Sequence, residues 1–141
     1  GVVRARYIAN RLDINLAIVD KRREKANVSE VLNIIGNVKD KDCILIDDIV
    51  DTGGTAVKSA AALIGSGAKT VSMFCTHGVL SGDAVKNIEN SYVDELIITD
   101  TINNQEKLKK SKKIKVLTVS NLIAEAMRRI VRNKSISQLF S

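Results

Sequence analysis

The chain has 141 residues, which is enough for one domain with a buried core. Its hydrophobic content of 45% and charged content of 27% are ordinary for a soluble globular protein. No apolar run approaches the roughly 20 residues needed to span a bilayer, and no signal segment opens the chain. We therefore expect one domain, residues 1–141, without a membrane span.

The two cysteines, Cys43 and Cys75, each lie within an apolar run. Buried reduced thiols are a better explanation of this pattern than a disulfide or a metal-binding pair. Because reduced structural thiols are typical of the cytosol, we expect a cytoplasmic protein.

The net charge of +6 comes from one short stretch rich in lysine. Its members are Lys107, Lys109, Lys110, Lys112, Lys113 and Lys115. Without them the basic residues only equal the 16 acidic ones, and two Phe and two Tyr leave few rings to stack on bases. We interpret the stretch as a solvated surface connection, and we expect no nucleic-acid partner.

Hydrophobic spacing predicts the secondary structure in chain order. Apolar residues at Val2, Ala5, Ile8 and Leu12 indicate a helix over 2–12. In the first half we then expect a buried strand at 16–20, a strand or helical turn at 31–36, a strand at 43–50, and a helix from residue 55 closed by Gly65 and Gly67. In the second half we expect strands at 70–77, 94–100 and 114–119, a helix at 81–90 with Ser81 near its cap, and a helix at 120–133 capped by Ser120.

Strands that alternate with helices, and that are apolar nearly throughout, predict an α/β fold with a mostly parallel sheet. Ligands of such sheets bind beyond the carboxyl ends of the strands. The predicted ends are Asp20-Lys21, Asp47-Asp48, Thr76-His77 and Thr99-Asp100.

The segment D-T-G-G-T joins a predicted strand to a predicted helix. Gly53 and Gly54 permit a tight loop of backbone N–H groups, and Thr52 and Thr55 add hydroxyls. The positive end of the helix dipole favours an anion at this point. The segment is not a P-loop, and Asp51 taken alone could be a turn or capping acid.

Asp47 and Asp48 precede this loop at the end of the same strand. Carboxylates accept hydrogen bonds from hydroxyl-rich ligands and also bind hydrated divalent metals. A phosphate in the loop, with hydroxyls reaching back to the acids, describes a sugar phosphate.

The stretch ILIDDIVDTGGT (44–55) resembles the ribose-phosphate signature of type I phosphoribosyltransferase-fold proteins, which implies a Rossmann-like sheet flanked by helices. Several activities share that signature. Three further segments resemble the ribose-phosphate pyrophosphokinase family: VDKRREKANVSEVLNIIGNV (19–38), CTHGVLSGDAVKNIENS (75–91) and LIAEAMRRIVRNKSISQLFS (122–141). The resemblance spans the whole chain.

This resemblance implies a reaction and its residues. The family transfers a pyrophosphoryl group from ATP to the anomeric hydroxyl of ribose 5-phosphate, which gives phosphoribosyl pyrophosphate and AMP. By resemblance, Lys21 and Arg23 match the catalytic residues, whose charge can meet the transferring phosphoryl oxygens. The match assigns the 5-phosphate to Asp51, Thr52, Gly53, Gly54 and Thr55, the ribose hydroxyls to Asp47 and Asp48, and, weakly, a regulatory site to Ser135 and Ser137. His77 receives no catalytic role.

The resemblance also implies partners. Family members are homo-oligomers, commonly hexamers, and are roughly twice as long as this chain. The chain matches their C-terminal half, so we expect the Mg²⁺ ligands and most of the ATP surface to lie in the N-terminal half. Phosphate is a possible activator. We expect little or no synthetase activity from the chain alone, and pairing with an N-terminal half or with further copies.

Two positions depart from the family pattern, because Glu24 and Gly78 stand where proline is usual. We expect Gly78 to loosen its turn. Two alternative functions remain: a base phosphoribosyltransferase, and a non-catalytic regulatory or complementing subunit of the synthetase. The KRR loop and the C-terminal helix argue against the first.

Overall fold

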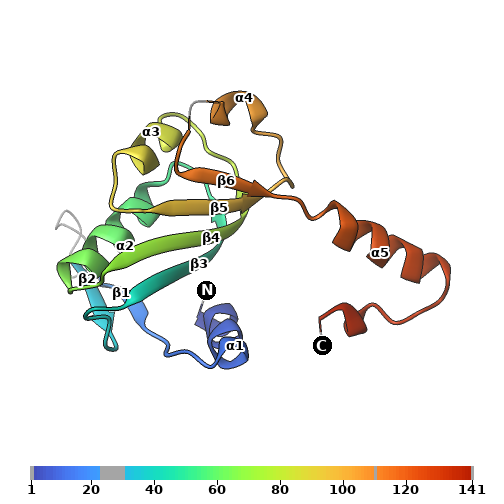
Figure 1. Ribbon diagram of the computed structural model, residues 1–141, viewed down its shortest axis with the longest axis horizontal. Helices are drawn as coiled ribbons and strands as arrows, with labels where there is room; N and C mark the ends of the chain where they lie inside the picture. The colour runs from blue at the N-terminus through green and yellow to red at the C-terminus, as the bar shows by residue number, and fades with distance from the viewer. Residues whose placement is uncertain (1, 23–30, 110, 141) are drawn as a thin grey trace.

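The computed structural model describes residues 2–22, 31–109 and 111–140. Four strands, β3 (Asp42–Val50), β4 (Thr70–Gly78), β5 (Glu95–Thr99) and β6 (Ile114–Leu117), form a parallel sheet in that order. The crossovers contain α2 (Gly54–Gly65), α3 (Ala84–Glu89) and the short α4 (Gln105–Leu108) (Figure 1). The predicted α/β class with a parallel sheet is confirmed.

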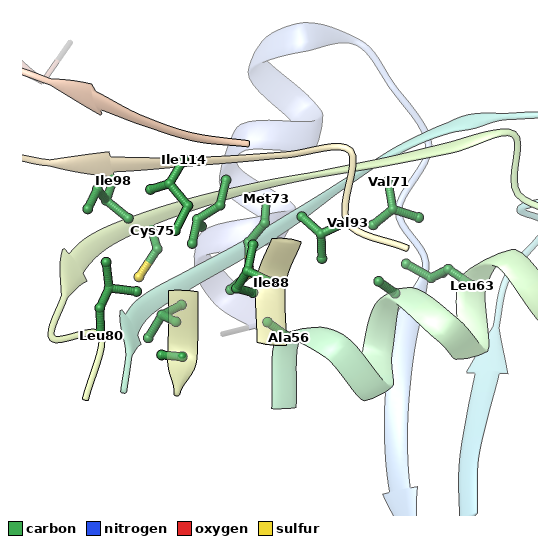
Figure 2. Close-up of a cluster of buried hydrophobic side chains, with 14 of the residues drawn as sticks. Ala56, Leu63, Val71, Met73, Cys75, Leu80, Ile88, Val93, Ile98 and Ile114 are labelled. Carbon is green, nitrogen blue, oxygen red and sulfur yellow. The ribbon is translucent and has the colours of Figure 1, made fainter. Parts of the chain in front are cut away.

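The core lies between one face of this sheet and the helices α2 and α3 (Figure 2). Alternate residues of β4 and β5 point into it because side chains of a strand alternate between faces. The sheet contributes Val71, Met73, Cys75, Leu96, Ile98 and Ile114, and the helices contribute Ala56, Ala60, Leu63, Ala84 and Ile88. The two thiols, Cys43 and Cys75, are both free, and burial raises the pKa of Cys75 to about 11. Cys75 is thus a packing residue of the core.

The predicted strand at 16–20 exists, but its expected place in the parallel sheet is wrong. β1 (Ile18–Arg22) pairs antiparallel with β2 (Val31–Ile35) in a separate two-stranded sheet. The Asp20-Lys21 pair therefore does not belong to the carboxyl edge formed by β3 to β6. An apolar run predicts that a strand is buried, and it does not identify the strand that will pair with it.

The two terminal helices, α1 (Val2–Leu12) and α5 (Ser120–Val131), agree with prediction in type. α5 projects away from the sheet and contains no buried residue (Figure 1). Its expected cap is wrong: Val119 occupies the N-cap position, Ser120 is the first helical residue, and no side chain caps the helix. A 3₁₀ turn, η1 (Ser137–Leu139), follows. None of the helices in the described ranges is long and apolar enough to cross a bilayer.

The lysine-rich stretch runs from the end of α4 to the start of β6, and several of its ammonium groups bond within the fold. Lys107 Nζ donates to the carbonyls of Val79 and Leu80, and Lys113 Nζ donates to the carbonyl of Ser91. Lys109 and Lys115 pair with Glu106 and Glu95, both at 2.6 Å. The stretch is a surface connection as predicted, and in addition it fastens α4 and β6 to their neighbours.

Candidate functional site

The loop between β3 and α2 presents backbone N–H groups at the start of a helix. Gly53 is the N-cap residue of α2, with φ of 77° in the left-handed region that glycine adopts without steric cost. The first bond into the helix runs from Val57 N to Gly53 O at 3.0 Å, so the earlier amides belong to the unpaired first turn. No side chain caps this helix end. Such an end favours an anion.

The loop rests on the core. Gly53 is buried, and a Cβ at this position would lie 3.5 Å from Ile88 Cδ1 and 3.6 Å from the carbonyl oxygen of Ala84. Val50 and Ala56, on either side of the loop, are 4% and 3% exposed. The turn therefore packs against α3 on one side. Its other side is open, and Asp51, Thr52 and Thr55 are exposed.

Residues after β4 bond to the same loop from the side. Ser81 Oγ donates to Asp51 Oδ1, and Ser81 N donates to the carbonyl of Asp51 at 3.1 Å. Asn87 Nδ2 donates to the carbonyl of Thr52 at 3.3 Å. Ser81 lies near the cap of α3, as predicted, but the N-cap residue itself is Asp83. The alternative of Asp51 as a capping acid is wrong, because its carboxylate accepts from Ser81 and does not cap α2.

The acid pair, Asp47 and Asp48, lies near the end of β3, shortly before the loop. Asp47 is half-buried and Asp48 is exposed. Arg4 of α1 pairs with Asp48 at 2.8 Å, and its hydrogen bond is the main cause that lowers the pKa of Asp48 to about 2. Asp48 is therefore a carboxylate at neutral pH and accepts hydrogen bonds only. Sequence analysis did not identify Arg4, which lies 44 positions away in the chain.

A cavity of about 900 Å³ lies between α1, residues 13–19, β3 and the first turns of α2. Its walls are mainly apolar, with Ala5 and Ile8 from α1 and Leu45 from β3, and Asp47 and Thr55 line it next to the loop. This volume is within the usual range for small-molecule sites. One residue of the acid pair, Asp47, and one of the loop, Thr55, thus line a cavity of suitable size.

The other predicted site residues belong to other segments of the chain. Lys21 belongs to β1, paired with Leu32, and Arg23 lies outside the described residues. Ser135 and Ser137 are joined through their hydroxyls at 2.7 Å, near the tail of the chain. Arg129 donates to the carbonyl of Ser135 beside a cavity of about 280 Å³ whose lining is mostly basic. The structure thus places Asp47 and Asp48 on β3 and residues 51–55 directly after it, while Lys21 belongs to β1 in the separate two-stranded sheet.

The turn at Gly78 is closely packed. A Cβ there would approach Ile98 Cδ1 to 2.6 Å, and the carbonyl of Gly78 accepts a bond from Asn104 Nδ2 at 2.5 Å. Asn104 is 4% exposed. Glycine therefore has a packing role where proline was expected. Glu24, the other departure, lies outside the described residues.

The described residues form no cluster of three His, Cys, Asp or Glu side chains that could hold a metal ion. Of the two adjacent acids, Asp48 is already paired with Arg4. Mg²⁺ commonly keeps several waters and binds through one or two carboxylates together with substrate phosphates, so a magnesium ion at this site stays a prediction.

Comparison with known proteins identifies the family. The sequence profile of the phosphoribosyl synthetase-associated domain matches residues 17–141. The chain belongs to this family. The DTGGT loop lies within the matched residues. The resemblance found in the sequence is therefore confirmed at family level.

The chain is similar to longer proteins named for a synthetase activity. Over 99% of its length, the chain is 57% identical to ribose-phosphate pyrophosphokinase from Hyphomonas neptunium and 55% identical to that from Campylobacter jejuni, covering 45% and 44% of them. The crystal structure of phosphoribosylpyrophosphate synthetase from Mycobacterium smegmatis superposes with a TM-score of 0.80 at 34% identity, over 92% of this chain and 42% of that one. The chain spans less than half of these relatives, and its placement in their C-terminal half stays a prediction.

Proposed function

We propose that the chain supplies the ribose 5-phosphate-binding part of a ribose-phosphate pyrophosphokinase. That enzyme transfers a pyrophosphoryl group from ATP to the anomeric hydroxyl of ribose 5-phosphate, giving phosphoribosyl pyrophosphate and AMP. One observation carries the proposal. The loop from Asp51 to Thr55, at the start of α2, follows directly on β3, whose last four residues include the acids Asp47 and Asp48.

The phosphate binds at the loop in this proposal. A dianionic phosphate accepts hydrogen bonds from backbone N–H groups at a helix start, where the helix dipole adds favourable charge. The exposed hydroxyls of Thr52 and Thr55 can donate as well. Gly53 supplies the left-handed backbone conformation that this turn requires.

The ribose lies toward the acids. Asp48 is ionised at neutral pH, and its carboxylate can accept bonds from two ribose hydroxyls. Arg4 already occupies Asp48 Oδ2, so the sugar uses the other oxygen or displaces Arg4 from an exposed pair. Asp47 Oδ1 accepts from the backbone N–H of Asp48 at 2.9 Å, which orients that carboxylate.

Transfer needs more than this site. We assign Lys21 and Arg23 to the charge that develops on the transferring phosphoryl oxygens, since cations stabilise that charge. ATP and Mg²⁺ would bind largely through groups outside the described residues. The proposed assembly is therefore a homo-oligomer of longer chains, or this chain paired with the remaining part of the enzyme.

Calorimetry on the 141-residue chain tests the binding claim. We expect ribose 5-phosphate to bind more tightly than ribose or inorganic phosphate alone, because only the ester occupies both ends of the site. Absence of ribose 5-phosphate binding would refute the proposal.

An assay for AMP release tests the incompleteness of the chain. With ATP, Mg²⁺ and ribose 5-phosphate we expect little turnover from the chain alone, and a gain on mixing with a separately expressed remainder of a relative. Robust turnover by the chain alone would contradict this. A mixture that stays inactive would favour a non-catalytic subunit, and release of pyrophosphate with a free base would favour a phosphoribosyltransferase.

A further inference from the structure

We propose that Ser81 and Asn87 are positioning residues that aim the N–H groups of Thr52 and Gly53 at the phosphate. This inference rests on the proposed function, since it names how the same loop is held in its binding conformation. Neither residue belongs to the D-T-G-G-T segment, and both reach it from the crossover between β4 and β5.

The orientation of two peptide groups carries the argument. In a trans peptide the C=O of one residue and the N–H of the next point in opposite directions. Ser81 N bonds to the carbonyl of Asp51, and Asn87 Nδ2 bonds to the carbonyl of Thr52. With both carbonyls directed toward the β4–β5 crossover, the amides of Thr52 and Gly53 point to the opposite side.

The side chain of Ser81 fixes the first of these groups in place. Its hydroxyl donates to Asp51 Oδ1 while its backbone N–H donates to the carbonyl of Asp51. Two bonds between the same pair of residues restrain rotation about the peptide that a single bond would leave freer. They also direct the Asp51 carboxylate toward Ser81, so that its charge is satisfied beside the loop.

Ser81 itself is presented by a well-held segment. Asn104 donates to the carbonyl of Gly78, and Lys107 donates to the carbonyls of Val79 and Leu80 at 3.0 and 3.2 Å. Leu80 is 1% exposed. A donor that is anchored in this way can impose its geometry on the loop that it contacts.

Asn87 acts from α3, which also supports the loop from below. The neighbouring residue Ile88 is fully buried and lies under Gly53. The helix α3 therefore supports Gly53 through Ile88 and orients the peptide between Thr52 and Gly53 through Asn87. Two crossovers thus form the site. The β3–β4 crossover contains the D-T-G-G-T motif, and the β4–β5 crossover contains Ser81 and Asn87.

The test uses the 141-residue chain with Ser81→Ala and Asn87→Ala, and the matched controls Ser91→Ala and Asn90→Ala. Ser91 Oγ also makes hydrogen bonds, to the carbonyl of Ile88 and from Val93 N, but none to the phosphate loop. Affinity for ribose 5-phosphate is measured by calorimetry, and the backbone order of Thr52 and Gly53 by ¹⁵N NMR relaxation without ligand. Melting temperature is recorded for every variant.

For each test variant we expect affinity to fall about five- to tenfold, as loss of one hydrogen bond predicts, with lower order parameters of the two amides. Ser81→Thr, which keeps the hydroxyl, should restore affinity. The controls should leave affinity and order parameters unchanged at a similar melting temperature.

Three results separate the possibilities. Weaker binding with unchanged order parameters would mean that Ser81 or Asn87 contacts the ligand directly, and would overturn the positioning role. Lower order parameters with unchanged affinity would reduce both residues to structural support and overturn it as well. If the parent chain fails to bind ribose 5-phosphate, the proposed function fails and this inference fails with it.

Discussion

The two ends of the proposed ligand site are built differently. The phosphate end consists of backbone groups on a buried base, with Gly53 packed over Ile88 and bonds from Ser81 and Asn87. The sugar end consists of exposed or half-buried carboxylates, with Asp48 held by the exposed side chain of Arg4. The first end is fixed by the core and the second by a surface ion pair.

This difference separates rigidity from adaptability. Groups held by core packing keep their geometry whether or not a ligand is present. A surface ion pair contributes little to stability and exchanges its partners readily. We therefore expect the phosphate end to be preformed and the sugar end to rearrange when ribose arrives.

The largest effect should follow from removing the base of the phosphate end. Ile88→Ala deletes a fully buried side chain, and we expect it to lower the free energy of unfolding by about 2–5 kcal/mol. Ile130→Ala on α5, where the residue is 59% exposed, should change it by less than about 0.5 kcal/mol. Urea unfolding measures both, and equal effects would contradict the packed base.

The next effect concerns the left-handed turn. Gly53→Ala forces a Cβ onto a residue with φ of 77°, which we expect to cost about 1–2 kcal/mol and to weaken phosphate binding. Gly65→Ala, in the last turn of the same helix with no atom within 4 Å of the added Cβ, should be neutral or stabilise by up to about 1 kcal/mol. Thermal unfolding distinguishes them, and a tolerated Gly53→Ala would refute the need for glycine.

The smallest effect is at the sugar end and appears in titration. Arg4→Gln removes the main cause of the lowered pKa, so the pKa of Asp48 should rise from about 2 toward 3.8. Because the pKa of Asp48 is lower in the folded chain, the ion pair stabilises the folded state at pH values above the ordinary pKa of an aspartate. This contribution is lost as the pH falls from about 4 to about 2. Carboxyl NMR titration measures the shift. Arg6→Gln on the same helix is the control, and an unchanged pKa in Arg4→Gln would contradict the ion pair.

Local pattern predicted much of the fold. The alternation of apolar strands with helices identified β3 to β6 and the helices α2 and α3, because burial on both sides of a parallel strand leaves a plain apolar run. The pairing of β1 with β2 could not be predicted in this way, since strand partners depend on packing between distant segments. The cap at Ser120 failed for a smaller reason, because the helix begins one residue earlier than a serine cap requires.

In the candidate site, too, features set by neighbouring residues were predicted and those set by distant residues were not. The loop at Gly53 and Gly54 was visible because its residues are contiguous and their conformational demands are specific. Ser81 and Arg4 were not identified as site residues because they reach the site from 30 and 44 positions away. Serine before a helix is usually a cap, and an arginine on a helix is usually solvated, so neither residue carries a distinctive local signal.

An NMR titration of the ¹⁵N-labelled chain with ribose 5-phosphate tests the central claim most directly. The account predicts that the amide signals of Gly53 and Gly54 move most, that those of Asp47 and Asp48 also move, and that ribose alone leaves the two glycines unchanged. Glycine signals that stay in place while ribose 5-phosphate binds elsewhere would contradict it.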